Sequence, residues 1–423
     1  MSDRWFPHAA IGSNGVATNE SSFSEMQGEA LLTRSVCRVA GALPRNVSLD
    51  GMRGVAALFV VLSHVVAGFA PSVYFGGRAD EDAWWWTVFS VTPGFFVING
   101  AFHVHLFFVL SAYVIAGSSD GARTPLLSQC AARIVRLSFP CAAAILLTYM
   151  LFKLDAMYMA KASEIVGHPW IERQYSDPNI SWSHALAEAL GTYYLTGGSI
   201  LVPVLWTMQR ELIGSIGIYI IFKSASAAST RLMAYVAIAA LCVVARLEPQ
   251  NYLCFVAGAA MYDLGVVKRR PPRQLVVAAI ALGIFLGGKP LSAPSLSSIY
   301  FPLVHFADGM HVTGLIYPLG AMLLLFGALT SPTMQNILSG RSGAFLGKIS
   351  FSLYLVHFPL LGSVQAAGFV YFGYTSSIAL ACVTLVYICV VLAVSTAFYA
   401  VVERPTLGLL RSIKRAHRPQ LAT

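Results

Sequence analysis

The sequence of 423 residues carries little charge and lacks several common functional motifs. Only 11% of its residues are charged, against roughly 25% in an ordinary soluble chain. It contains no G-x-x-x-x-G-K-[ST] loop, so we expect no ATPase module. It also shows no internal repeat with a period of about 20–50 residues, which argues against a solenoid or propeller.

Cysteine is scarce and is not arranged as a ligand motif. The seven cysteines show no C-x-x-C spacing, and most of them fall in apolar stretches. We therefore expect neither a disulfide framework nor a zinc site. Residues 1–47 hold no long apolar run but many Ser, Gly, Asn and Glu residues. This composition predicts a disordered cytoplasmic segment without a cleaved signal peptide.

Apolar residues, in contrast, dominate the chain. They make up 57% of it, and the mean hydropathy is +0.67. Stretches long enough to cross a bilayer occur at 52–70, 101–117, 137–154, 204–222, 232–247, 251–267, 274–288, 313–329, 349–371 and 376–400. These stretches predict an all-α membrane bundle of about ten transmembrane helices, with long outer loops at 71–100 and 155–203. In the first of these loops, Trp84–Trp86 are expected to form an interfacial anchor or, alternatively, to line an acceptor site.

The basic residues are distributed unevenly between the two sides of this bundle. Of the 28 Lys and Arg residues, 20 fall on the side of the N-terminus and 6 on the opposite side, while Arg53 and Arg210 lie within spans. Because Lys and Arg concentrate in cytoplasmic loops, both termini are predicted to be cytoplasmic. The net charge of +9 is then a topology signal and does not indicate a nucleic-acid partner. We expect a multi-pass protein of a bacterial inner (plasma) membrane, with a basic cytoplasmic tail at 406–423.

The first span combines an apolar run with two ionisable side chains. Residues 48–66 read SLDGMRGVAALFVVLSHVV, with Arg53 near the start and His64 deep inside. Ionisable groups within a membrane are costly unless they meet a partner or a watery cavity. His64 lies about 16 Å along the helix from Arg53, near the middle of the hydrocarbon core. His64 is therefore either a proton-transferring group or a hydrogen-bonded core histidine.

Five segments, in order along the chain, carry a resemblance to a known family. They are SLDGMRGVAALFVVLSHV at the first span, HLFFVLSAYVIA (105–116), RIVRLSFP (133–140), LWTMQREL (205–212), and ISFSLYLVHFPLL (349–361) with ERP (403–405). This set resembles the signatures of the integral-membrane acyltransferase 3 family and covers a domain at 48–405. Two positions depart from the family pattern. Ala112 replaces a usual Gly, and Arg210 places a charge before Glu211, where it either pairs with an acid or points to the outer surface.

The resemblance implies an acyl-CoA-dependent O-acyltransferase. Members of the family transfer an acyl group, often acetyl, from cytoplasmic acyl-CoA to sugars, lipids, peptides or polyketides. Acyl-CoA would be the donor substrate, and no permanently bound cofactor or metal is expected. The sizeable outer loops favour a hydroxyl of a cell-envelope or secreted glycan as the acceptor. A small lipid or a polyketide is the alternative acceptor.

The resemblance also implies roles for the residues in its motifs. His64 would deprotonate the acceptor hydroxyl, and Glu211 would either hold the histidine or bind the acceptor. Arg133 and Arg136 share one helix face at i, i+3, where two guanidinium groups suit the phosphates of coenzyme A. The alternatives are a helix-end charge for Glu211 and ordinary cytoplasmic charge for the two arginines.

Two further residues keep two interpretations each. Arg53 either contacts the donor or pairs with Asp50, three residues before it. His357, three residues after Tyr354, either lines the donor tunnel or bonds a neighbouring helix.

A proton-coupled secondary transporter is the rival class. In that case His64, Arg53 and Glu211 would form a relay for protons and substrate. A non-catalytic export partner is a third possibility. Dependence on coenzyme A separates an acyltransferase from both.

Overall fold

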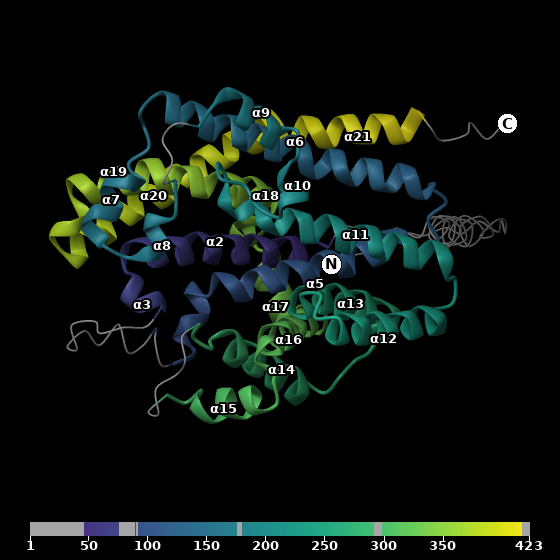
Figure 1. Ribbon diagram of the computed structural model, residues 1–423. Helices are drawn as coiled ribbons and strands as arrows, with labels where there is room; N and C mark the ends of the chain where they lie inside the picture. Colours follow the sequence, from purple (N-terminus) through teal and green to yellow (C-terminus); the bar gives the residue numbers. More distant parts are fainter. Residues whose placement is uncertain (1–45, 76–88, 90–91, 176–179, 292–297, 417–423) are drawn as a thin grey trace, which may run out of the picture.

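The computed structural model describes residues 46–75, 89, 92–175, 180–291 and 298–416. These residues form helices and contain no strand (Figure 1), which confirms the all-α prediction. Trp84–Trp86, nearly all of the predicted N-terminal segment and the last residues of the predicted tail lie outside the described residues.

The helices follow one another with short connections. The first part of the chain forms α2 (Val47–Phe69), α3 (Pro71–Phe75), η1 (Pro93–Ile98), α5 (Gly100–Ser119), α6 (Leu126–Lys153), α7 (Met159–Val166), α8 (Pro169–Glu172), α9 (Trp182–Ala189), α10 (Tyr193–Thr196), η2 (Pro203–Leu205) and α11 (Trp206–Ser224). The middle forms α12 (Ala228–Val244), α13 (Pro249–Asp263), η3 (Val266–Lys268), α14 (Arg273–Gly287), α15 (Phe301–Gly309), η4 (Thr313–Leu315), α16 (Ile316–Thr330) and α17 (Pro332–Ser339). The last part forms α18 (Arg341–Leu360), η5 (Leu361–Gln365), α19 (Ala366–Tyr371), η6 (Gly373–Thr375), α20 (Ser377–Phe398), η7 (Tyr399–Glu403) and α21 (Arg404–Ala416).

Six helical segments among the described residues are long and apolar enough to cross a membrane. They are Val47–Phe69, Gly100–Ser119, Leu126–Lys153, Thr313–Thr330, Arg341–Tyr371 and Ser377–Ile413. The other four predicted spans also contain helices, but α12, α13 and α14 have only 17, 15 and 15 residues. The fourth, α11, carries Arg210, Glu211 and Lys223. The chain is thus a multi-pass membrane protein with six helices that have the length and composition of a span.

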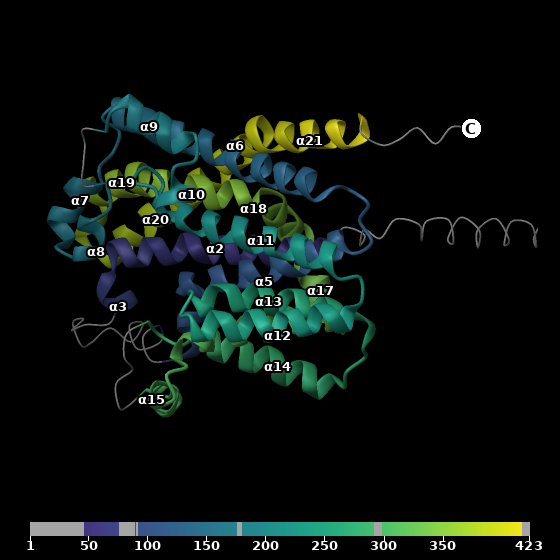
Figure 2. The same cartoon turned by 45° about the vertical axis from the view of Figure 1, so that its right-hand side comes forward.

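Two groups of helices pack on either side of α2. One apolar core joins α2 to α6, α18, α20 and the segment from α7 to α10. A second core joins α2 to α5, α11, α13 and α16. Figures 1 and 2 show α2 and α5 in the middle of the bundle, with the start of α2 and the end of α21 toward the same end.

Glycine allows α2 and α18 to touch along their backbones. A side chain at Gly54 would overlap the backbone of Leu346, and one at Gly347 would overlap the backbone of Asp50. Gly343 and Gly347 form a G-x-x-x-G pattern, which lets membrane helices approach closely. α18 is also the helix packed most extensively against α2. Because both helices start at the same end of the bundle, residues equally far beyond this contact face each other.

The predicted outer loop at 155–203 is largely helical and packs against α6. Trp182 contacts the ring of Tyr149 near the far end of α6, with 5.4 Å between ring centroids. Tyr194 accepts a hydrogen bond from Ser138, with 3.2 Å between their oxygens. Tyr149 and Ser138 are eleven residues apart on one helix, or about 16 Å. The segment from α9 to α10 therefore runs alongside α6 into the bundle before α11 begins.

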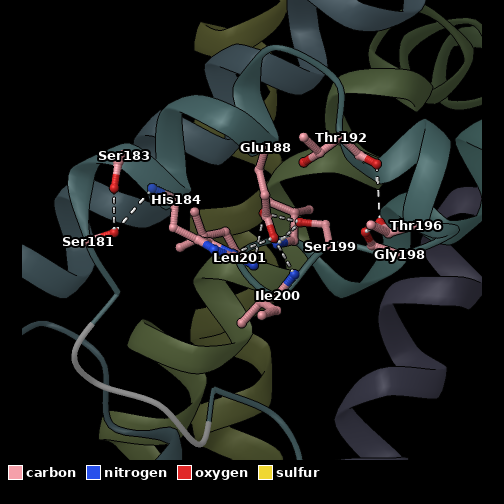
Figure 3. Close-up of polar contacts among 11 residues, drawn as sticks. Ser181, Ser183, His184, Glu188, Thr192, Thr196, Gly198, Ser199, Ile200 and Leu201 are labelled. Atoms are coloured by element: carbon pink, nitrogen blue, oxygen red, sulfur yellow. Dashed lines mark hydrogen bonds and ion pairs between the residues drawn. The ribbon is translucent and has the colours of Figure 1, made fainter.

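A buried glutamate fixes the turn that leads into α11. Glu188 is 4% exposed and accepts hydrogen bonds from Ser199 Oγ at 2.6 Å and from the backbone N–H of Ile200 at 2.8 Å. It also accepts from the N–H of Leu201 and lies 3.2 Å from His184 Nε2 (Figure 3). Burial of an ionised carboxylate is tolerated when several donors satisfy it. These bonds set the start of α11, the helix that carries Glu211.

Candidate active site

A cavity of about 410 Å³ opens between α2, α5, α6, α11, α18 and η7. Asp50 and Arg53 from the first turns of α2 line it, as does Lys348 from the second turn of α18. Its mouth therefore lies at the end of the bundle where α2 and α18 begin. Tyr354 and Thr207 line it as well, and both lie further along their helices from this mouth or toward the bundle interior. The cavity thus extends from one end of the bundle toward its middle.

The cations of the cavity differ in whether they are already neutralised. Arg53 pairs with Asp50, at 3.3 Å between nitrogen and oxygen. Arg136 and Lys348 form no ion pair and no hydrogen bond with any described residue. Lys348 Nζ instead lies 5.2 Å from the ring centroid of Tyr399. Arg136 is exposed and is attracted electrostatically by Glu403, another lining residue. Both unpaired cations are thus available to an anionic ligand.

Arg133 is engaged within the protein. It forms a buried ion pair with Glu211, and its Nε donates to Ser215 Oγ at 3.0 Å. Its second nitrogen lies 3.1 Å from Ser111 Oγ, which also donates to Glu211. These bonds link α5, α6 and α11 at the wall of the cavity. Arg133 and Arg136 share a helix face, as predicted from their spacing, but only Arg136 is unpaired.

His64 and His357 meet beyond the inner end of the cavity. Each lies ten residues after the glycine contact of its helix, at Gly54 and Gly347. His357 Nε2 is 3.1 Å from His64 Nδ1, and the ring centroids are 5.1 Å apart. His64 does not line the cavity, but Tyr354 does, and its ring lies 5.8 Å from the ring of His357. Tyr354 thus separates the cavity from the histidine pair.

Aromatic side chains from the predicted outer loop cover the other side of His64. The ring of Trp170 in α8 is stacked on the imidazole of His64, with 6.1 Å between centroids. Phe75 at the end of α3 lies 6.3 Å from Trp170 and is stacked on His168 at 5.0 Å. His64, Trp170, Phe75 and His168 all keep part of their surface exposed. His64 is therefore approached by the cavity on one side and by an aromatic group on the other.

The structure gathers the predicted site residues into two groups. Arg53, Arg133, Arg136 and Glu211 line the cavity, whereas His64 and His357 form the pair. Glu211 contacts Arg133 rather than His64. No observation on the molecule tests the roles predicted for these residues, and the roles stay predictions.

Other positions gain a place that the motifs did not suggest. Lys348 lines the cavity, although the sequence distinguished it from no other cytoplasmic cation. Its place one residue after Gly347, in the G-x-x-x-G pattern, was the available signal. Arg210 pairs with Glu248 at 2.6 Å, which decides between its two predicted surroundings. The hydrogen bonds from Arg210 hold the pKa of the Glu248 carboxyl below its usual value.

Comparisons with known proteins agree with this geometry. The acyltransferase domain family, acyltransferase 3, matches residues 46–400. The chain is 25% identical over 366 residues to the O-acetyltransferase PaAT-1 of Phomopsis amygdali, covering 75% of this chain and 73% of that protein. No solved structure matches. The resemblance carried by the five segments is thereby confirmed: the chain belongs to the acyltransferase 3 family and is a membrane acyltransferase.

Proposed function

We propose that this protein moves an acyl group, acetyl in the first instance, from cytoplasmic acyl-CoA to a hydroxyl of a cell-envelope or secreted glycan. The observation that carries the proposal is the cavity, with unpaired cations near its mouth and the histidine pair beyond its inner end. The likeness to an O-acetyltransferase supports acetyl as the group and oxygen as the acceptor atom.

The donor would bind with its phosphates at the mouth of the cavity. Arg136 and Lys348 have no counter-ion within hydrogen-bond reach, and Arg53 adds a third positive charge beside them. A guanidinium group forms strong, charge-assisted hydrogen bonds with phosphate oxygens, and a lysine supports them as a point charge. The pantetheine arm would then extend inward along the apolar part of the lining, toward Tyr354. This placement brings the thioester near the histidine pair.

His64 would act as the general base in the transfer. It takes the proton of the acceptor hydroxyl as the oxygen attacks the thioester carbonyl carbon. The carbon–sulfur bond then breaks, and the thiolate leaves as the coenzyme A thiol after taking up a proton. A transient acyl-histidine at the same nitrogen is compatible with the same residues.

The acceptor would approach from the side that Trp170 covers. Sugar rings have apolar faces that pack on aromatic side chains, and Trp170, Phe75 and His168 form an aromatic group beside His64. These side chains support a glycan hydroxyl as the acceptor. A small lipid or polyketide hydroxyl remains the second choice of acceptor.

The proposed orientation follows from the basic residues. We place both termini in the cytoplasm and ten spans across the plasma membrane, because 20 of 28 Lys and Arg residues lie on the side of the N-terminus. In a variant without native cysteines, Lys161→Cys should react with an impermeant thiol reagent on intact cells. Lys268→Cys should react only after the membrane is opened. The reverse pattern would place the cavity mouth outside the cell and remove the donor argument.

Turnover in proteoliposomes tests the function itself. Purified protein supplied with acetyl-CoA and a hydroxyl-bearing glycan should release free coenzyme A thiol, and mass spectrometry should find the acetylated glycan. The His64→Ala protein is the matched blank. Proton-coupled uptake of a solute without thiol release would support the transporter instead. Acetylation of a lipid or polyketide acceptor, with no glycan product, would replace only the acceptor.

A further inference from the structure

The backbone contacts of the histidine pair determine where its protons lie. His357 Nδ1 is 3.2 Å from the carbonyl oxygen of Leu353, one turn earlier in α18. A carbonyl oxygen only accepts, so a neutral His357 must carry its proton on Nδ1. Its Nε2 then holds a lone pair and can only accept a hydrogen bond.

The same reasoning applies to His64. Its Nδ1 lies 3.0 Å from the carbonyl oxygen of Val60 and 3.1 Å from His357 Nε2. Both neighbours are acceptors, so Nδ1 of His64 carries the proton and shares it between them. Nε2 of His64 consequently keeps its lone pair. One arrangement of protons satisfies all three contacts with two neutral rings.

From these contacts we infer that His357 is a positioning residue for His64. It accepts the Nδ1–H of His64 and thereby turns the basic Nε2 toward the acceptor hydroxyl. The inference rests on the proposed function, because it takes His64 as the base. It replaces the donor-binding role that the motif suggested for His357, which is fully buried and does not line the cavity.

The pair suits a base in an apolar surrounding. When Nε2 takes the proton of the hydroxyl, the positive charge on His64 is met by two hydrogen-bond acceptors, Val60 and His357, that are already in place. Neither acceptor is charged in the resting protein, so the pair avoids the cost of an ion in the membrane. Tyr387 donates to the carbonyl oxygen of His357 at 2.8 Å and helps to hold this turn of α18.

Three variants separate positioning from donor binding and from a purely structural role. His357→Leu removes the acceptor of the Nδ1–H, whereas His357→Gln offers an amide oxygen at about the same reach. Tyr387→Phe is the matched control, since it removes a hydrogen bond to the same residue without altering the imidazole. Steady-state kinetics with acetyl-CoA and the acceptor are measured for each variant, at equal amounts of inserted protein.

The expected result is a selective effect on turnover. His357→Leu should lower kcat and kcat/KM equally, on the order of 10- to 100-fold, with KM for both substrates unchanged. His357→Gln should recover kcat to within about threefold of wild type, and Tyr387→Phe should stay close to wild type. A kcat of His357→Leu within twofold of wild type, or a raised KM for acetyl-CoA at constant kcat, would overturn the inference.

A spectroscopic measurement on the wild-type protein covers the case in which His357→Leu fails to assemble. Protein labelled with ¹⁵N-histidine is compared with its His64→Asn variant, and the difference should show His64 protonated at Nδ1 and bare at Nε2. The opposite tautomer would contradict the inference. An active His64→Ala protein would instead remove the proposed function, so the two failures can be told apart.

Discussion

The cavity and the histidine pair lie on the same two helices but differ sharply in polarity. Seven charged residues line the cavity, namely Asp50, Arg53, Arg133, Arg136, Glu211, Lys348 and Glu403. Around the pair, the neighbouring rings are those of Trp170, Tyr354 and Phe358. Charges are inexpensive at a hydrated end of a membrane bundle and costly at its middle.

This difference indicates a division of labour along α2 and α18. The cavity end has cations suited to a polyanionic donor, while the apolar end has neutral bases suited to proton transfer. Changes at the cavity should therefore act mainly on donor affinity, and changes at the pair on turnover. The variants below test that separation, from the largest expected effect to the smallest.

Loss of the base should have the largest effect. His64→Ala should lower transfer by about 10³-fold, because general base catalysis contributes roughly 10²–10⁴-fold. Membrane insertion should not suffer, since the change removes a polar group from an apolar run. His305→Ala, at an exposed histidine in α15, is the control and should retain full activity. Activity of His64→Ala within a few fold of wild type would remove His64 as the base.

Arg133 should respond as a structural group of the cavity wall. Arg133→Ala leaves the carboxylate of Glu211 buried without its partner, which typically costs about 3–5 kcal/mol. Thermal unfolding in detergent should show a large loss of stability, and the double variant Arg133→Ala/Glu211→Gln should recover part of it. Equal stability of the single and double variants would mean that the ion pair does not hold the wall. A stable Arg133→Ala protein with impaired acyl-CoA binding would restore the donor role predicted from the motif.

The glycine contact should matter to activity although it touches neither substrate. Gly347→Ala introduces a methyl group that overlaps the backbone of Asp50 and pushes α2 from α18. A displacement of about 1 Å at a catalytic group can cost about 10²-fold, and the pair lies only ten residues further on. Gly217→Ala in α11 is the control, because a methyl group there meets open space. Full activity of Gly347→Ala would show that α2 and α18 tolerate separation.

The unpaired cations should act on donor affinity alone. Arg136→Ala and Lys348→Ala should each raise KM for acetyl-CoA by about tenfold, since a hydrogen bond to a charged group is worth roughly 1.5–3 kcal/mol. Their kcat should stay near wild type. Arg123→Ala, an exposed cation outside the cavity, controls for general surface charge. An unchanged donor KM in both variants would mean that these cations serve only membrane orientation.

Local sequence signals predicted the helices but not their partners. Each of the ten predicted spans contains a helix, because apolar length and composition are properties of one segment. His64 and His357 are 293 positions apart, and their contact depends on how α2 crosses α18. A single chain shows the glycines but not which helix they meet. The family motif named both histidines without showing that they touch.

The segment at 155–203 shows a second limit. It has no apolar run of spanning length, so the sequence predicted an outer loop. Its short helices instead bury single side chains, such as Met159, Ile171 and Tyr193, against α6 and α18. Burial of this kind depends on a neighbouring surface that must already be formed. The same limit applies to Arg133, whose ion pair with Glu211 joins two helices that the motifs treat separately.

Trp170 should give the smallest effect and the sharpest test of which side each substrate uses. Its ring is stacked beside His64 on the side away from the cavity. An aromatic contact contributes roughly 0.5–1.5 kcal/mol, so Trp170→Ala should raise KM for the acceptor by about two- to tenfold. KM for acetyl-CoA should not change, because Trp170 does not line the cavity. Trp170→Phe should keep most of the acceptor affinity.

Trp182→Ala is the matched control, since Trp182 packs on Tyr149 and has no contact with His64. Full kinetic curves for both substrates are needed for each variant. If Trp170→Ala weakened acetyl-CoA and left the acceptor unaffected, the two substrates would share one entrance. The separation between a charged donor cavity and an aromatic acceptor side would then fail, even with His64 intact as the base.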